Sequence, residues 1–301
     1  MSGASSDGQP LPLSRAPAVD LAPWVSRLFM TEVATPDDHV IDCGLFNDTC
    51  YVRVLLQGEW SAETSDGVVQ HDGGSLFFGP QSRRMPVSVR GSFRTIGFGF
   101  RPGACHALFG IDAETMVDRI VPIHQVADGL DFDDLSSAPD LSGPAALALL
   151  ETRLRVFIRE RSERQPDPIT SSFDRAAFHD PTLVISRFAQ ENSIDQRRLQ
   201  RLIKRDFGTS PKRVLRRARV LDMASHLRWV ADDAESEILM QRYFDQSHLI
   251  REFQKFMDQT PAQFAVKPQP ILTLALEVRQ ARRLEELGRL KSGAPSPWEA
   301  Q

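Results

Sequence analysis

The stretch LQRLIKRDFGTSPKRVL, residues 199–215, decides how the C-terminal half of this 301-residue chain folds. Its apolar residues recur at the spacing of one helix face, and Gly208 followed by Pro211 ends that helix and starts the next. A second stretch, IREFQKFMDQTPAQF at residues 250–264, repeats the order of basic residue, aromatic residue, spacer, Ser or Thr, and Pro. The repetition predicts two similar helical units rather than one ordinary amphipathic helix.

The first unit is predicted to place a row of polar side chains on the outer face of a capped helix. A helix over residues 184–191 precedes a turn at 192–194, and Asp195 is expected to cap the next helix. Arg and Gln side chains can form bidentate hydrogen bonds with guanine and adenine in the major groove. The base-reading candidates are Gln196, Arg197, Gln200 and Arg201. The phosphate-contacting candidates are Arg198, Lys204, Arg205 and Lys212, the last at the start of a further helix over residues 212–227.

The second unit is predicted to repeat this arrangement. Residues 235–243 would form its supporting helix, and residues 245–257 its reading helix. Polar groups at the N-terminal turn of a helix lie at its positive dipole end, which can approach phosphate. The base-reading candidates here are Gln246, Ser247 and Arg251, and the phosphate candidate is Lys255.

The charge is unevenly distributed along the chain. The net charge is −4, which alone does not favour a nucleic-acid partner. Residues 181–267, however, hold 16 Lys and Arg against 11 Asp and Glu, a net +5, and residues 1–180 carry −10. The densest part, residues 195–228, carries +8 and coincides with the first unit. An acidic half joined to a basic half indicates nucleic-acid interaction.

The N-terminal half reads as β-structure followed by a helix. Residues 22–100 hold runs of β-branched and aromatic residues separated by Gly-containing turns, which predicts a small barrel or sandwich. A helix is expected from Pro144, after a loop at 128–144. Its apolar residues form a seam of about two heptads, which is consistent either with a dimer interface or with packing on its own domain. The dimer-interface candidates are Leu147, Leu150, Leu154 and Phe157.

On the motifs LQRLIKRDFGTSPKRVLRRAR and DQSHLIREF with TPAQF, the segment 171–264 resembles the paired helix-turn-helix domain of AraC/XylS-type bacterial transcription regulators. The N-terminal half, through FGPQSR and GFRPGACHALFG, is similar to the cupin-type sensor domain often found in that family. The resemblance implies a cytoplasmic regulator that binds double-stranded DNA as a homodimer. It also implies control by a small-molecule effector or partner and contact with RNA polymerase.

We therefore expect an α+β multi-domain protein, with a cupin-like barrel followed by an all-α domain of two helix-turn-helix units. The expected segments are a flexible arm (1–21), the sensor and dimerisation domain with its C-terminal helix (22–165), the DNA-binding domain (166–267), and a C-terminal helix and tail (268–301).

The sequence departs from the family pattern at three turn positions, where Gly is usual because the backbone tends to adopt a positive φ. Ser193 occupies the first turn, and Asp258 follows the second reading helix. Either Arg242 or Tyr243 occupies the Gly position of the second turn, depending on whether one residue is deleted.

Two other function classes fit the sequence less well. A cupin-type metal-dependent enzyme would need a cluster of ligands, but His71 stands alone and the remaining histidines are scattered. A DNA-repair or architectural protein could use the same paired helices, yet repair would call for a reactive cysteine with a metal. The three cysteines lack C-x-x-C spacing and are consistent with free thiols in a reducing cytosol. We expect no catalytic residues, metal, cofactor or membrane span.

Overall fold

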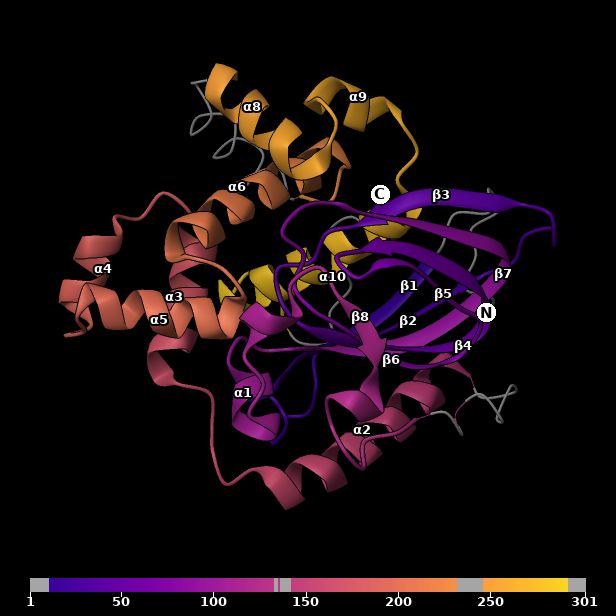
Figure 1. Cartoon of the computed structure of the whole chain (residues 1–301), viewed down its shortest axis with the longest axis horizontal. Coiled ribbons are helices and arrows are strands. Elements are labelled where there is room, and N and C mark those ends of the chain that lie inside the picture. The colour runs from indigo at the N-terminus through magenta and orange to yellow at the C-terminus, as the bar shows by residue number, and fades with distance from the viewer. Residues whose placement is uncertain (1–10, 133–134, 136–141, 232–245, 292–301) are drawn as a thin grey trace.

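The structure is a computed structural model, and it describes residues 11–132, 135, 142–231 and 246–291. An antiparallel sheet makes up most of the N-terminal part of the chain, and helices make up the rest (Figure 1). This is the α+β organisation that the sequence predicts.

Eight antiparallel strands form one strongly bent sheet. They are β1 (Leu11–Arg15), β2 (Val25–Val33), β3 (Val40–Leu45), β4 (Tyr51–Thr64), β5 (Gly67–His71), β6 (Gly74–Phe78), β7 (Met85–Phe100) and β8 (Ile120–Pro122). Neighbouring strands follow the order β1-β2-β7-β4-β6-β8, while β3 also pairs with β7 and β5 with β4. Within the described residues β1 and β8 do not pair, so hydrogen bonds do not close the barrel, and the sheet is cupin-like and open.

The two long strands β4 and β7 bend because β4 carries a bulge at Gly58. The register between them shifts on both sides of Gln57, and Gly58 has a φ of 104°. A Cβ at Gly58 would lie 2.6 Å from the Cβ of Phe93, so only glycine fits. Such a bulge strengthens the local twist. The bend places the first half of β4 and the second half of β7 in one layer, with β6 and β2. The second half of β4 and the first half of β7 lie in a second layer, with β5 and β3.

The helices follow in two groups. Near the sheet lie α1 (Ala104–Phe109), the short 3-10 helices η1 (Ala113–Met116) and η2 (Ile123–Gln125), and α2 (Gly143–Arg161). The C-terminal helices are α3 (Pro168–His179), α4 (Ile185–Glu191), α5 (Gln196–Phe207), α6 (Pro211–Leu227), α8 (Gln246–Met257), α9 (Pro261–Val266) and α10 (Pro270–Glu286). Their starts at 185, 211 and 246 each lie within one residue of the predicted starts.

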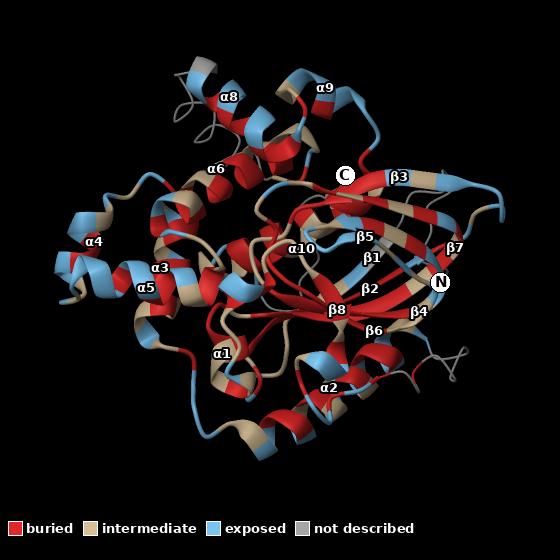
Figure 2. Ribbon diagram, in the orientation of Figure 1, coloured by how far each residue is buried: buried red, intermediate tan, exposed pale blue. Residues whose placement is uncertain are grey.

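The sheet is covered on both faces, and the buried residues collect where the layers meet (Figure 2). One core lies between the sheet and α1 and α2 and contains Val52, Phe98 and Leu150. A second core joins residues inside the barrel, such as Phe46, to residues of α6, α8, α9 and α10. A third, separate core lies within α3 to α6. The barrel and the second helical unit therefore share one hydrophobic interior.

Strand β1 corrects the expectation of a flexible arm over residues 1–21. Leu11 pairs with Glu32 and Arg15 with Leu28 across β2. The guanidinium of Arg15 also lies 2.9 Å from the carboxylate of Glu151 on α2, at an ion-pair distance. The expectation is wrong from residue 11 onward because this segment completes the sheet edge, and residues 1–10 lie outside the described part.

Helix α2 packs its apolar seam on its own domain. Leu147, Leu150, Leu154 and Phe157 are all buried in the core that α2 shares with the sheet. Of the two interpretations of the apolar seam, a dimer interface or packing within the domain, the structure shows packing within the domain. These four side chains have no surface left for a partner, so a homodimer stays a prediction without this interface.

Candidate nucleic-acid interface and its contact with the barrel

Helix α5 has the cap and the two faces that the sequence predicts. The carboxylate of Asp195 accepts hydrogen bonds from the backbone N–H groups of Arg197 (2.9 Å) and Arg198 (3.1 Å). The inner face is buried against α3, α4 and α6, with Leu199 and Phe207 in the third core. Four exposed side chains on the other face are the predicted base readers: Gln196, Arg197, Gln200 and Arg201.

Two of the three turn positions that depart from the family pattern adopt the left-handed backbone that favours glycine. Ser193 has a φ of 51° and Asp258 a φ of 55°. A residue with a Cβ carries strain in this region. The third position, Arg242 or Tyr243, and the supporting helix predicted at 235–243 lie outside the described residues. The structure therefore explains why glycine is usual at two of these sites.

Helix α8 of the second unit is buried on one face. Phe253 and Phe256 lie in the core shared with the barrel, while Arg251 and Lys255 are exposed. Gln246 and Ser247 are the first two residues of α8, and their side chains lie outside the described part. The structure therefore shows only the C-terminal part of the predicted polar face of α8, where Arg251 and Lys255 lie.

Helix α6 connects the two units and holds α8 through a buried carboxylate. At about 1.5 Å per residue, its 17 residues span about 26 Å. Glu252 of α8 is 4% exposed and forms ion pairs with Arg216 and, at 3.1 Å, with Arg219, both on α6. These two arginines are therefore engaged inside the domain, although they lie in the most basic part of the sequence.

The phosphate candidates differ in how available they are. Arg198, Lys212 and Lys255 are exposed. Lys204 forms an ion pair with Glu114 of η1, which belongs to the barrel half. Arg205 pairs with its neighbour Asp206 at 2.6 Å. In this arrangement the C-terminal end of α5 faces the barrel half, and its N-terminal end remains exposed.

The C-terminal end of α5 fits closely against the barrel half at Gly208. This residue caps α5 with a φ of 74°, and a Cβ on it would lie 2.7 Å from Val117 and 2.8 Å from Pro80. Close packing here and the Lys204–Glu114 pair both fix α5 on η1.

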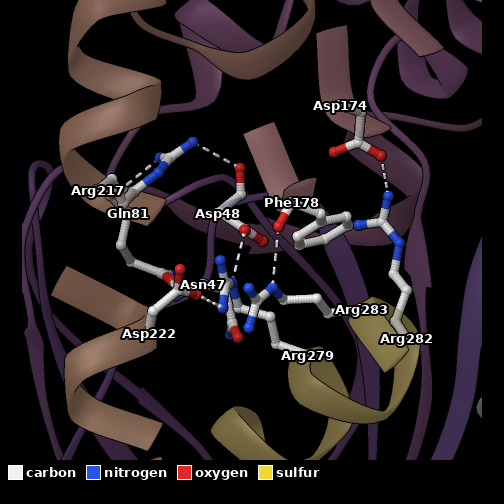
Figure 3. Close-up of polar contacts among 10 residues, drawn as sticks. All are labelled: Asn47, Asp48, Gln81, Asp174, Phe178, Arg217, Asp222, Arg279, Arg282 and Arg283. Atoms are coloured by element: carbon white, nitrogen blue, oxygen red, sulfur yellow. Dashed lines mark hydrogen bonds and ion pairs between the residues drawn. The ribbon is translucent and has the colours of Figure 1, made fainter. Parts of the chain in front are cut away.

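Arg217 of α6 is buried and binds two backbone carbonyls of the barrel. Its guanidinium donates to the oxygen of Gln81 at 3.0 Å and to that of Asp48 at 2.7 Å (Figure 3). Burial lowers the pKa of Arg217 to about 10, so the side chain stays charged at neutral pH. The backbone N–H of Arg84 also donates to the carbonyl of Phe256 at 2.6 Å. Both units are therefore fastened to the barrel.

Helix α10 completes the contact by placing buried arginines between the two halves (Figure 3). Arg279 lies 3.1 Å from Asp48 of the barrel and 2.7 Å from Asp222 of α6. Burial raises the pKa of Asp48, but the charges of Arg279, Arg217 and Arg282 outweigh it and lower that pKa overall.

Two further arginines tie α10 to α3. Arg282 pairs with Asp174, whose pKa burial raises despite this partner. Arg283 donates to the carbonyl oxygen of Phe178 at 3.1 Å. Helix α10 is thus an ionic link between the barrel, α3 and α6.

This ionic link is not evident from the sequence. Arg279, Arg282 and Arg283 belong to a helix expected to be merely amphipathic, and each is buried. Their i, i+3 and i+4 spacing places them on one helix face, which in the sequence looks the same as a solvated polar face. Their acidic partners Asp48, Asp174 and Asp222 are scattered in the sequence and carry no motif.

The described residues contain no group of three or more His, Cys, Asp or Glu side chains placed to hold a metal ion. Among the helices in the described ranges, none is long and apolar enough to cross a membrane.

The comparisons with known proteins concern two parts of the chain. Residues 188–266 match the family described as a helix-turn-helix domain, and residues 14–122 match a domain of unknown function, DUF6597. A search of curated protein sequences found no match.

Three solved structures show the range of structural similarity. ToxT from Vibrio cholerae is 6% identical with a TM-score of 0.48, covering 85% of this chain and 98% of ToxT. The AraC-like transcriptional activator CuxR is 13% identical with a TM-score of 0.27, covering 70% and 86%. An ethanolamine utilization protein, EutQ, from Salmonella typhimurium is 12% identical with a TM-score of 0.23, covering 33% and 77%. At these identities and TM-scores none of the three assigns a function.

The helix-turn-helix match covers α5, α6, α8 and α9, the elements that carry the motifs LQRLIKRDFGTSPKRVL and TPAQF. The match to residues 14–122 covers the strands of the open barrel from β2 to β8. The chain thus carries the AraC-type helix-turn-helix domain of the AraC/XylS-type regulators, joined to an N-terminal sheet domain.

Proposed function

We propose that the protein is a sequence-specific transcription regulator that reads double-stranded DNA with α5 and α8. The observation that carries the proposal is the exposed row of Arg and Gln side chains on the capped helix α5, opposite a fully buried face. Arg201 and Gln200 belong to the two residue types that bind guanine and adenine edges bidentately. The exposed Arg198 and Lys212 flank this row and would contact phosphates.

The barrel is proposed to control this reading through a bound small molecule or a partner. The supporting observation is that the helical half is fastened to the barrel by Lys204, Arg217 and Arg279. Any shift of the barrel against α10 would move the elements that hold α5 and α8. A homodimer and contact with RNA polymerase belong to the same proposal, as the resemblance implies, and sedimentation velocity tests the dimer.

The test is genome-wide mapping of bound sites, followed by binding measurements on one mapped fragment. Replacing Arg201 by Ala is expected to cost about 1–3 kcal/mol and to relax preference at one base pair. Replacing Lys212 by Ala should weaken all sequences alike and reduce the salt slope by about one. Arg175→Ala, at an exposed residue on α3, is the matched control and should change neither. Unchanged affinity and salt slope in both test variants would contradict the proposal.

A further inference from the structure

Arg53 is a buried guanidinium for which the described residues offer no acidic partner. It is 7% exposed and lies on β4, pointing into the core shared by the barrel and the C-terminal helices. No carboxylate of the described residues lies within ion-pair distance of it, and its side chain donates no hydrogen bond to any of them. Burial lowers its pKa from the ordinary arginine value. Arginine nonetheless remains charged in proteins.

The surroundings of Arg53 are aromatic. Its guanidinium carbon lies 5.1 Å from the ring centre of Trp60, and between 5.8 and 5.9 Å from those of Phe29, Tyr51 and Phe78. Cation–π contacts of this kind favour the charge. The ring faces are no substitute for a charged acceptor that matches the guanidinium fork. The five N–H donors of the fork are therefore left for another partner.

A cavity lies next to this guanidinium. Its volume is about 60 Å³, and it is lined by Arg53, Tyr51 and Phe29 from the barrel and by Leu274, Ala275 and Val278 from α10. By the same measure one water needs only about 10–15 Å³, so the space holds several non-hydrogen atoms. The cavity has room for a compact ligand next to the unpaired charge, and α10 forms its cover.

The charges around the cavity are also unbalanced. Four of its lining residues are arginines and one is an aspartate. Three of the arginines have partners: Arg27 lies 2.9 Å from Glu285, Arg279 pairs with Asp48 and Asp222, and Arg282 pairs with Asp174. Arg53 alone supplies an uncompensated positive charge to the cavity.

We propose that this cavity binds a compact organic carboxylate, with the carboxylate paired to the guanidinium of Arg53 and the apolar remainder between the aromatic rings and α10. A carboxylate matches the planar fork of an arginine bidentately, which a neutral ligand cannot do. Burial raises the pKa of Tyr51 to about 12, so its hydroxyl stays protonated and can donate a further hydrogen bond. The inference rests on the proposed control by a small molecule and names its chemical class.

The position of the cavity gives the ligand a route to the DNA-binding half. The ligand would contact the face of α10 whose Arg279 and Arg282 also line the cavity and tie α10 to α6 and α3. Binding that requires α10 to shift would therefore act on the ionic link between the halves. Whatever the ligand, it can change that arrangement only by its difference in affinity for the two states.

The test is thermal unfolding of the full-length protein with sodium acetate, benzoate or phenylacetate, each against its amide at matched ionic strength. At least one acid should raise the Tm, by roughly 5 °C at a hundredfold excess over its Kd. Its amide should not. Inorganic phosphate should have no such effect, because it lacks the apolar group that would pack between the aromatic rings and α10. Oleate should have none because the cavity is too small for a long chain.

The variants assign the effect to Arg53. Arg53→Met should lose the response to the acid, whereas the same change at Arg90, exposed on β7, should keep it. If Arg53→Met does not fold, Arg53→Lys keeps the charge without the fork and should weaken the acid at least tenfold. The proposal is overturned if no acid exceeds its amide, if phosphate or oleate acts as strongly as the acids, or if the Arg53 variant responds like the wild type.

These measurements use no DNA. Failure of all three acids, with intact binding to a mapped DNA fragment, would overturn the carboxylate site and leave the transcription regulator standing. If an acid stabilises the protein but the protein binds no DNA fragment, the transcription regulator is overturned and the carboxylate site stands.

Discussion

Replacing Arg279 by Leu is expected to destabilise the whole protein, because it removes the partner of a carboxylate that cannot reach water. Asp222 is 1% exposed and lies 2.7 Å from Arg279, while Asp48 lies 3.1 Å from it on the barrel side. Removing one partner of a buried ion pair costs about 3–5 kcal/mol because the other charge stays buried. We therefore expect the free energy of unfolding to fall by about this amount.

The assay is urea unfolding of four proteins: wild type, Arg279→Leu, Asp222→Leu and the double variant. The double variant should lose less than the sum of the two single variants, by at least about 1 kcal/mol, because the second change removes the charge that the first leaves unpaired. Arg175→Leu, on the exposed face of α3, is the control and should stay within about 0.5 kcal/mol of wild type. A loss below about 1 kcal/mol for Arg279→Leu would refute the view that α10 locks the halves together through buried charge.

Three further predictions concern backbone and charge. Ser193→Gly and Asp258→Gly, at φ values of 51° and 55°, should each stabilise the protein by about 0.5–1 kcal/mol in thermal melts, whereas Ser186→Gly within helix α4 should not. Gly208→Ala should destabilise it by more than 1 kcal/mol in urea, since a Cβ there meets Val117 and the φ is 74°. The free energy of unfolding measured against pH should fall as the pH drops below about 3.8. The folded pKa of Asp48 lies below that ordinary value, so the stabilisation from its charge is present above pH 3.8 and is lost as the pH falls towards the folded pKa. Asp48→Asn should flatten this part of the profile, and an unchanged profile would contradict the assignment.

The sequence predicted the parts of the fold that are specified locally. The cap at Asp195, the left-handed end at Gly208 and the exposed Arg and Gln row of α5 depend on neighbours within a few residues, and each was readable from the chain. The link made by Arg279 was not readable, because its partners Asp48 and Asp222 lie 231 and 57 residues away.

The seam of α2 shows a different limit of sequence reading. Its heptad-like spacing specifies an apolar face but not the surface that covers it, and the cover is the chain's own sheet. Strand β1 was missed for a related reason, since a short edge strand is specified by its pairing with β2 rather than by its composition.

The two helix-turn-helix units differ in whether each would keep its hydrophobic core if it were joined to a different sensor domain. The first has a hydrophobic core of its own, in which Phe173, Phe188 and Phe207 pack together within α3 to α6. The second borrows its interior from the barrel, with the ring of Phe256 5.8 Å from that of Phe46. In a chimera that joins residues 166–301 to another sensor domain, the first unit would keep its own hydrophobic core. The second unit would expose the hydrophobic face that the barrel covers here. Recombination between such regulators is therefore constrained to exchange the second unit together with the barrel wall on which it rests.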